Sequence, residues 1–236
     1  MSRMLSVQHL SKHFGTLRAL DQVSLEVPQN AITGIIGSNG AGKTTLLLGI
    51  AGLLPMDGGT LYWEDKVLPA RARSHTIFYV EDAMRPHGQL PVEFVLRFYA
   101  SIFGRKKTLT QEIINRLELG DFLRVRVSDL SKGTAKRFLI GLGLLSTQPI
   151  LMLDEPFDGL DLKQTLEVIP LLREISATGR TLVLSIHQLR DAQRACDRFI
   201  LLSNGKLVGR GTLSELQALA GCAPSAGLEE IFLALM

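Results

Sequence analysis

The sequence predicts an α/β fold with a mixed parallel sheet, an antiparallel β subdomain and a helical insertion. Before Pro28, apolar and polar residues alternate, which is typical of half-buried antiparallel strands. Further along, short apolar segments such as 31–36 and 150–153 alternate with helical segments, which is typical of buried strands in a parallel sheet. Between about 91 and 145 the apolar spacing is that of helices.

The size and composition are those of one large soluble domain. The chain has 236 residues, of which 46% are hydrophobic and 21% charged, and its formal net charge is +3. That charge is too small to indicate nucleic-acid binding by itself. No apolar segment reaches the roughly 18 residues of a membrane span, and the N-terminus lacks the apolar segment of a secretory signal. We expect a cytoplasmic protein that contacts a membrane only through a partner.

The first third of the chain is predicted to be mostly β-structure. A helix is expected at 44–51, ended by Gly52. The sequence Asp57-Gly58-Gly59 predicts a hairpin-like turn. The expected strands include 5–7, 23–27, 31–36, 60–63 and 77–80.

Helices are predicted for residues 91–145, and strands alternate with helices after that. Val92, Val95, Leu96 and Tyr99 share one helical face, and Thr110 is a plausible N-cap. Pro170 predicts a kink or early break in its helix, and Asn204-Gly205 predicts a hairpin. The later segments are the strands 150–153, 181–186 and 199–202, the helices 162–176 and 189–195, and a short amphipathic helix at 228–235.

A phosphate-binding loop follows the strand at 31–36. Residues 37–44 fit G-x-x-x-x-G-K-[ST] in full and open a helix. Glycines let successive N–H groups point into one concavity that stabilises phosphate oxygens. Lys43 should reach the β and γ phosphates, and Thr44 should hold Mg²⁺. The motif predicts a P-loop NTPase core; the alternative is a glycine-rich turn with a chance Lys-Thr pair. The predicted nucleotide-binding residues are Gly37, Ser38, Asn39, Gly40, Ala41, Gly42, Lys43, Thr44 and Thr45.

Two acids follow the buried strand at 150–153. Parallel strands present their carboxyl ends to the ligand site of an α/β sheet. Asp154 is therefore expected to bind Mg²⁺ opposite Thr44, and Glu155 is expected to activate the attacking water as general base. The alternative is a pair of acids that only solvates a loop.

Three further motifs have the order found in one family. Residues 130–134 read Leu-Ser-Lys-Gly-Thr at a predicted helix start, residues 158–161 read Asp-Gly-Leu-Asp, and residues 185–187 read Ser-Ile-His. With the phosphate loop and the carboxylate strand, the chain from Leu5 to about Leu219 resembles the ATP-binding subunit of an ABC transporter, and the signature motif at 130–134 is more like that of exporters.

The resemblance implies ATP and Mg²⁺ as ligands, and ATP hydrolysis. It implies that Phe14 stacks on adenine, although a core phenylalanine is a serious alternative. Ser131 and Gly133 would bind the γ-phosphate held by a second ATPase subunit, and Asp161 would communicate across that dimer. His187 would orient the γ-phosphate and the attacking water; the alternative is a surface or capping histidine. Lys43, Glu155 and His187 are the implied catalytic residues.

The resemblance also implies an organisation and partners. Residues 1–81 and 148–220 would form the nucleotide-binding core, 82–147 a helical subdomain with the signature motif, and 221–236 a C-terminal tail, all within one ATPase domain. The implied partners are a second copy of the chain and a transmembrane permease subunit, at the cytoplasmic face of the cell membrane. The alternative function is ribosome or nucleic-acid remodelling, which the charge of +3 does not favour.

Two positions depart from the family pattern. The signature usually reads LSGGQ, so Lys132 replaces a glycine and Thr134 a glutamine; Lys132 either adds a cation near the phosphates or points to solvent. Glu81 aligns with the glutamine of the family's Q-loop, after the strand at 77–80. A carboxylate there is expected to be a further Mg²⁺ ligand. The alternative is that Glu81 is solvated and misaligned.

Overall fold

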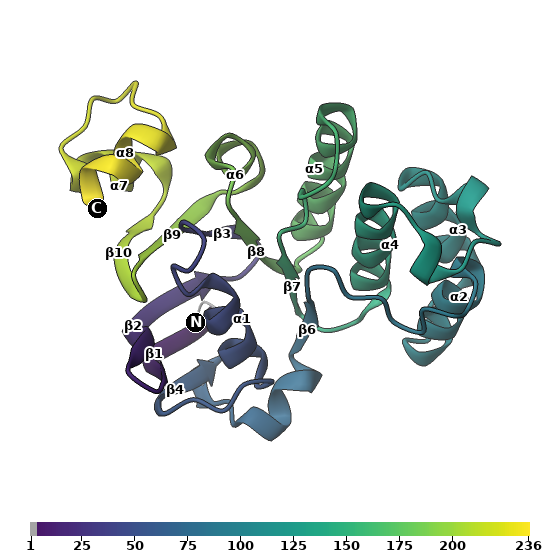
Figure 1. Cartoon of the computed structure of the whole chain (residues 1–236), viewed down its shortest axis with the longest axis horizontal. Helices are drawn as coiled ribbons and strands as arrows, with labels where there is room; N and C mark the ends of the chain where they lie inside the picture. Colours follow the sequence, from purple (N-terminus) through teal and green to yellow (C-terminus); the bar gives the residue numbers. More distant parts are fainter. Residues whose placement is uncertain (1–3) are drawn as a thin grey trace.

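Two sheets form the centre of the computed structural model, which describes residues 4–236 (Figure 1). The larger sheet has the strand order β10-β9-β3-β8-β7-β6. Its strands from β9 to β6 run parallel and β10 is antiparallel to β9, so the predicted mixed sheet is confirmed. The strands are β3 (Ile32–Ile36), β6 (Ile77–Val80), β7 (Ile150–Asp154), β8 (Thr181–Ile186), β9 (Arg198–Ser203) and β10 (Lys206–Gly211).

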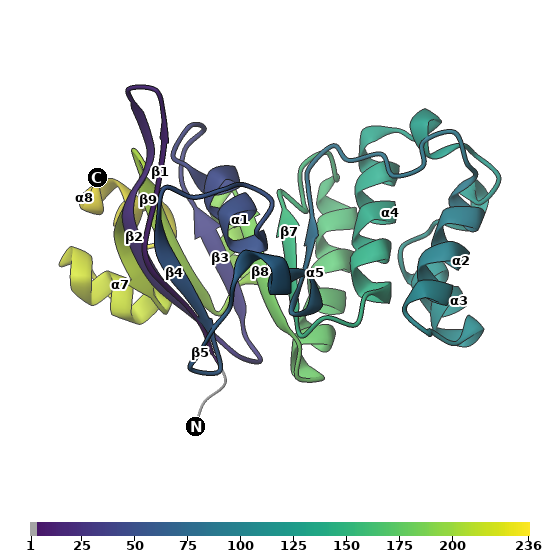
Figure 2. The ribbon, with the colours of Figure 1, turned by 90° about the horizontal axis from the view of Figure 1, so that it is seen from below.

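The smaller sheet is the predicted antiparallel subdomain, with the order β2-β1-β4-β5. Its strands are β1 (Met4–Phe14), β2 (Leu17–Pro28), β4 (Gly58–Trp63) and β5 (Lys66–Val67). Helix α1 (Lys43–Ala51) contacts strands of both sheets (Figure 2). Residues of β3 alternate between two hydrophobic clusters, with Ile35 facing the smaller sheet and Ile36 the opposite side. Burial on both faces explains why β3 has a continuous apolar sequence.

The hairpin-like turn predicted at residues 57–59 is wrong, because Gly58 and Gly59 are the first residues of β4. Gly59 has φ +105°, and a Cβ there would lie 2.6 Å from the Cα of Leu10 in β1. The glycine lets two strands approach closely and does not reverse the chain.

Within residues 4–236, five α-helices and a short 3-10 helix (Ala70–His75) lie outside the insertion. The α-helices are α1, α5 (Leu162–Ala177), α6 (Leu189–Ala195), α7 (Leu213–Ala220) and α8 (Leu228–Leu235). Gly52 ends α1 with φ +78°, as predicted. Helix α5 does not end at Pro170. The missing hydrogen bond is tolerated because buried residues on both sides of it, among them Ile169 and Leu171, pack into the core.

The helical insertion joins β6 to β7 and contains α2 (Val92–Ile102), α3 (Lys107–Arg116) and α4 (Lys132–Leu145). Thr110 is not an N-cap, since α3 begins at Lys107. Thr110 is buried one turn inside the helix, and its hydroxyl lies 3.5 Å from the Lys106 carbonyl oxygen. Packing of the insertion therefore determined the helix start, and the local capping preference did not.

Two arginines fix the C-terminal end of α4. Arg105 donates to the carbonyl oxygens of Leu145 (2.8 Å) and Ser146 (2.6 Å). Arg180 donates to those of Gly143 (2.9 Å) and Gln148 (3.0 Å) and to the Ser146 hydroxyl. Burial lowers the pKa of Arg180 to about 10, so its guanidinium stays charged at neutral pH. These bonds satisfy carbonyl groups that the end of a helix leaves without partners.

The C-terminal part of the fold agrees with the prediction. Asn204 and Gly205 both have positive φ, 48° and 73°, as a tight hairpin between β9 and β10 requires. Helix α8 buries Leu228, Ile231 and Phe232 against the core. Within residues 4–236, no helix combines the length and the apolar character needed to cross a membrane.

Candidate nucleotide site

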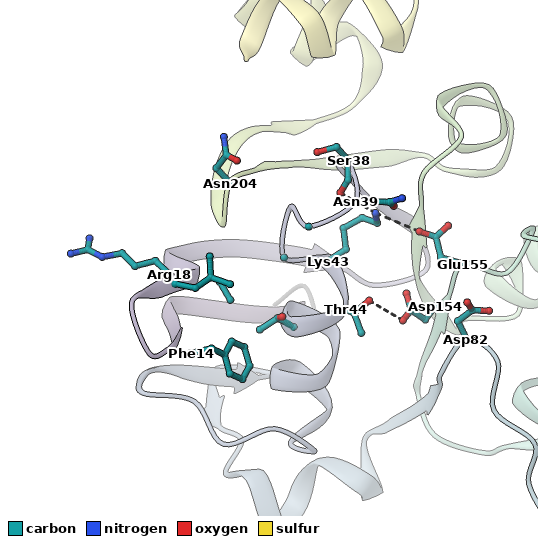
Figure 3. A pocket seen from close by; sticks show the side chains of 15 residues that line it. Phe14, Arg18, Ser38, Asn39, Lys43, Thr44, Asp82, Asp154, Glu155 and Asn204 are labelled. Carbon is teal, nitrogen blue, oxygen red and sulfur yellow. Dashed lines mark hydrogen bonds and ion pairs between the residues drawn. The ribbon is translucent and has the colours of Figure 1, made fainter.

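A cavity of about 500 Å³ lies where β3 and β7 end, beside the first turn of α1 (Figure 3). Most of the predicted phosphate loop lines it, together with the end of β1 and the start of β2. Gly37 and Ala41 are not part of the wall. The lining residues are Phe14, Leu17, Arg18, Ala19, Ser38, Asn39, Gly40, Gly42, Lys43, Thr44, Thr45, Asp82, Asp154, Glu155 and Asn204.

The loop has the backbone geometry of an anion-binding turn. Gly40 and Gly42 have φ of +81° and +102°, which side chains other than glycine rarely adopt. At Gly42 there is also no room, since a Cβ would lie 2.6 Å from the Ala19 carbonyl oxygen. Gly42 caps α1 without a side-chain hydrogen bond, and the first turn of α1 has no acidic residue. Its N–H groups and helix dipole are therefore available to an anion.

Lys43 lies under the loop, with 7% of its side chain exposed. Its Nζ donates to the carbonyl oxygens of Gly37 (2.9 Å) and Ser38 (3.4 Å). It also lies 3.5 Å from Oε1 of Glu155. The ammonium group is thus held at the cavity wall, and its charge is balanced by a carboxylate of the same chain.

Asp154 and Thr44 provide a carboxylate and a hydroxyl side by side. Thr44 Oγ1 donates to Asp154 Oδ2 at 3.2 Å, Tyr79 OH donates to the same oxygen at 3.2 Å, and the Ser185 hydroxyl donates to Oδ1. Burial, followed by the nearby Asp154 charge, raises the pKa of Tyr79, so Tyr79 remains a donor and fixes the Asp154 side chain.

This pair fits Mg²⁺ bound together with a triphosphate. Among residues 4–236, no group of three or more His, Cys, Asp or Glu residues could hold a metal ion by itself. Mg²⁺ accepts this arrangement, because it usually keeps several waters and takes one or two protein ligands plus phosphate oxygens.

Glu155 joins the phosphate loop to His187. Its Oε2 lies 2.6 Å from His187 Nδ1 and accepts a hydrogen bond from the His187 backbone N–H at 3.2 Å. The Glu155 N–H donates to the Ser185 hydroxyl at 2.8 Å. Glu155 has φ +48° and lines the cavity with Asp154. A carboxylate so placed can accept a proton from a water molecule, and His187 can orient it.

Phe14 lies at the outer side of the cavity, with its ring directed toward it (Figure 3). Half of the residue's surface, 50%, is exposed, so the alternative of a core phenylalanine is wrong. The Lys12 ammonium lies 5.4 Å from the ring centroid. An exposed aromatic ring beside a phosphate loop is a suitable surface for stacking a flat base.

The remaining predicted residues do not line the cavity of their own chain. Ser131 is the N-cap of α4, and its Oγ accepts from the Thr134 N–H at 3.3 Å. Gly133 packs against the Gly159 carbonyl oxygen, which a Cβ would approach to 2.8 Å. Asp161 caps α5, accepting from the Gln164 N–H at 2.8 Å.

Two charged positions differ in part from expectation. Lys132 is 63% exposed, but its Nζ lies 2.7 Å from Asp158 of the same chain. Glu81 is exposed and does not line the cavity, whereas the next residue, Asp82, does. Asp82 is paired with Lys136 of α4 at 2.5 Å. Sequence reasoning missed Asp82 and Lys136, and the only available signal was the position of Asp82 beside Glu81.

The known proteins that this chain is similar to are ATP-binding proteins of ABC transporters. The family model described as ABC transporter matches residues 20–158. The ABC-type transporter ATP-binding protein EcsA of Bacillus subtilis is 30% identical over 98% of this chain and 96% of its own length. The manganese transport system ATP-binding protein MntB of Listeria monocytogenes is 30% identical over 89% of this chain and 91% of its own. Nod factor export ATP-binding protein I of Ralstonia nicotianae is 30% identical over 90% of this chain and 68% of its own length.

Solved structures have the same architecture. An ATP-binding subunit of an ABC transporter superposes with a TM-score of 0.88 and 27% identity, over 98% of this chain and 99% of that one. The ADP conformation of an ATP-binding cassette superposes with a TM-score of 0.77 and 25% identity, over 99% of both chains.

Proposed function

Because this chain belongs to the ABC transporter family, whose ATP-binding subunits hydrolyse ATP, we propose that it binds Mg²⁺–ATP between two copies of itself and powers an exporting permease. The observation that carries the proposal is the position of Glu155. Its carboxylate lies between Lys43 and His187 beside the phosphate loop, where an attacking water would be activated.

The roles of the residues follow from this geometry. The amides of the loop and Lys43 bind the phosphates, while Thr44 and Asp154 would hold Mg²⁺, which supplies positive charge to the phosphate oxygens. Glu155 accepts a proton from the attacking water while the water oxygen forms a bond to the γ-phosphorus. The bond between the γ-phosphorus and the bridging oxygen breaks, and ADP leaves with that oxygen. His187 holds the Glu155 carboxylate and orients the water. Phe14 stacks on the adenine.

A second copy is part of the proposal because one chain leaves the cavity open. The N-terminus of α4 carries Ser131 and Gly133 but lies outside the cavity of its own chain. No acidic residue occupies the first turn of α4, so its free N–H groups suit a phosphate. Two chains arranged head to tail would place this turn over the partner's ATP, exclude water and bring Asp161 to the interface.

Light scattering tests the dimer with a variant that binds ATP but hydrolyses it slowly. We expect Glu155→Gln to double its mass with Mg²⁺–ATP and to remain a monomer with Mg²⁺–ADP. A protein that stays monomeric with ATP, alone and with its permease, would contradict the dimer.

The transport role needs a separate test. The chain has no membrane span among its described residues, so we infer that a permease subunit holds it at the cytoplasmic face of the membrane. Lys132 in the signature supports export. ATPase rates measured with membranes that contain the permease should exceed those of the chain alone. Stimulation by added RNA or DNA instead would contradict a transport role.

We also propose a metal role for Glu81, although it is exposed and lies outside the cavity wall, so its carboxylate would have to move toward Asp154 to reach Mg²⁺. Replacing Glu81 by Gln should retain ATPase activity but shift its Mg²⁺ dependence to higher concentration, because an amide binds Mg²⁺ more weakly than a carboxylate. The measurement is the ATPase rate over a Mg²⁺ titration at fixed ATP. Glu230→Gln, on the exposed side of α8, is the control. An unchanged titration would count against Glu81 as a ligand.

A further inference from the structure

A cavity of about 320 Å³ lies between the two sheets, apart from the nucleotide site. Thr33, near the start of β3, lines it together with residues of β2 in the smaller sheet and of β9 and β10 in the larger sheet. Strands β2 and β10 contact each other (Figure 1). The phosphate loop follows the opposite end of β3, and none of residues 4–236 lines both cavities. We call this second space the intersheet cavity.

The hydroxyl group of Thr33 has no partner at the wall of the intersheet cavity. Thr33 is only 1% exposed, and its buried Oγ1 forms no hydrogen bond with any described residue. Thr33 faces the smaller sheet, as Ile35 does, because residues two positions apart in a strand share a face. The strand register places Thr33 opposite Arg198 of β9. A buried hydroxyl without a partner is unfavourable, so a ligand in the cavity gains from supplying the missing hydrogen bond.

Two opposite charges at the intersheet cavity also lack ion-pair partners. Of the four charged residues that line it, Arg198 and Glu215 neutralise each other at 3.0 Å. Glu26 and Arg210 form no ion pair within the described part of the chain, and Arg210 has only the Ser24 carbonyl oxygen, at 3.5 Å. A ligand that carries both a cation and an anion can pair with both residues without bringing them together.

We propose that the intersheet cavity binds a small zwitterion, namely an α-amino acid with an apolar side chain. The ligand's carboxylate pairs with Arg210, whose planar guanidinium can donate two parallel hydrogen bonds, and it also accepts from the Thr33 hydroxyl. The ligand's ammonium group pairs with Glu26. Pro28 and Ile200 supply apolar surface for the side chain. A volume of about 320 Å³ is sufficient for a ligand of this size.

This inference goes beyond the proposed function and does not depend on it, because the two cavities share no lining residue among residues 4–236. Isothermal titration of the full chain with L-leucine and L-phenylalanine tests it. N-acetyl-L-leucine keeps only the carboxylate, and L-leucinamide keeps only the ammonium group. We expect both derivatives to bind at least about tenfold more weakly than L-leucine, since each loses one charged hydrogen-bonding group.

Charge-removing variants test the two walls of the intersheet cavity separately. Glu26→Gln and Arg210→Gln should each weaken L-leucine binding by about thirtyfold. Both side chains are exposed at one end, so the variants should fold like the parent. Glu230→Gln and Arg190→Gln are the matched controls, because these residues are also exposed and lie outside the cavity. Both controls should keep the parental affinity.

Thr33→Val tests the buried hydroxyl, and the chain supplies a close control for it. Thr181 in β8 is also 1% exposed with an unpartnered Oγ1, but it does not line the intersheet cavity. Both Thr33→Val and Thr181→Val should unfold at a temperature at least as high as the parent, because each removes an unpartnered hydroxyl. Only Thr33→Val should weaken L-leucine binding, by about tenfold.

Three results would overturn the inference. The first is the absence of binding by both amino acids at millimolar concentration. The second is binding of N-acetyl-L-leucine as tight as that of L-leucine, which indicates a site for simple anions. The third is parental L-leucine affinity in Glu26→Gln, Arg210→Gln and Thr33→Val, which places the ligand elsewhere on the chain.

Discussion

Glu155→Gln is expected to lower ATP turnover by about two to three orders of magnitude, because a general base contributes about 10²–10⁴ to the rate. The same change should tighten ADP binding to the isolated chain by about tenfold, or about 1.4 kcal/mol. The reason is the ion pair between Glu155 and Lys43, which a bound phosphate has to displace. Phosphate release under single-turnover conditions measures the first effect, and equilibrium dialysis of ADP measures the second.

Glu155→Asp separates the two effects. Aspartate keeps the negative charge but is shorter, so it should lose the 2.6 Å contact with His187 Nδ1. We expect slow turnover without the gain in ADP affinity. Turnover of Glu155→Gln close to that of the parent would exclude Glu155 as the general base. Equal ADP affinity in the parent and in both variants would show that the pair with Lys43 does not compete with nucleotide.

Gly42→Ala is expected to weaken ATP binding by at least about thirtyfold, which corresponds to about 2 kcal/mol. A non-glycine residue in this region of φ costs about 1–3 kcal/mol. In addition, the new Cβ would lie 2.6 Å from the Ala19 carbonyl oxygen, so the loop has to move away from β2. Titration with a fluorescent ATP analogue measures the affinity, and thermal unfolding measures the accompanying loss of stability.

Gly40→Ala is the matched control for the packing part of this effect. Gly40 also has positive φ, +81°, but a Cβ there meets nothing within 4 Å. It should suffer the backbone strain without the clash, and therefore weaken ATP binding clearly less than Gly42→Ala. Equal losses in the two variants would show that the contact with Ala19 is unimportant. Parental affinity in Gly42→Ala would mean that phosphate binds elsewhere.

The features that were predicted correctly depend on residues adjacent to one another in the sequence. The conformation of residues 37–44 follows from glycines that permit positive φ, and the hairpin at Asn204-Gly205 follows from the same rule. The two faces of β3 follow from its continuous apolar sequence. In each case the preference of a short segment agrees with its tertiary surroundings, so a local pattern is sufficient.

The sequence-based predictions were wrong or incomplete where residues far apart in the sequence determine the local structure. Thr110 has the right chemistry for an N-cap, but packing of the insertion starts α3 earlier. Gly58 and Gly59 are residues typical of a turn, but the absence of a side chain at Gly59 lets β4 pack closely against β1. The pairing of Asp82 with Lys136 joins residues that no periodicity relates. Lys132 is solvent-exposed and still pairs with Asp158, which depends on how the start of α4 meets the loop that precedes α5.

The arginine-bound end of α4 has a consequence for the choice of amino acid at position 180. Burial disfavours the charged form of any base, yet a guanidinium starts from so high a pKa that Arg180 remains a cation in every compartment of a living cell. A lysine in the same place would start from a lower pKa, so the same burial would bring it closer to losing its proton as the pH rises. It also could not donate to the carbonyl oxygens of Gly143 and Gln148 with the two arms of a guanidinium. The attachment of the insertion is thereby insulated from a rise in intracellular pH.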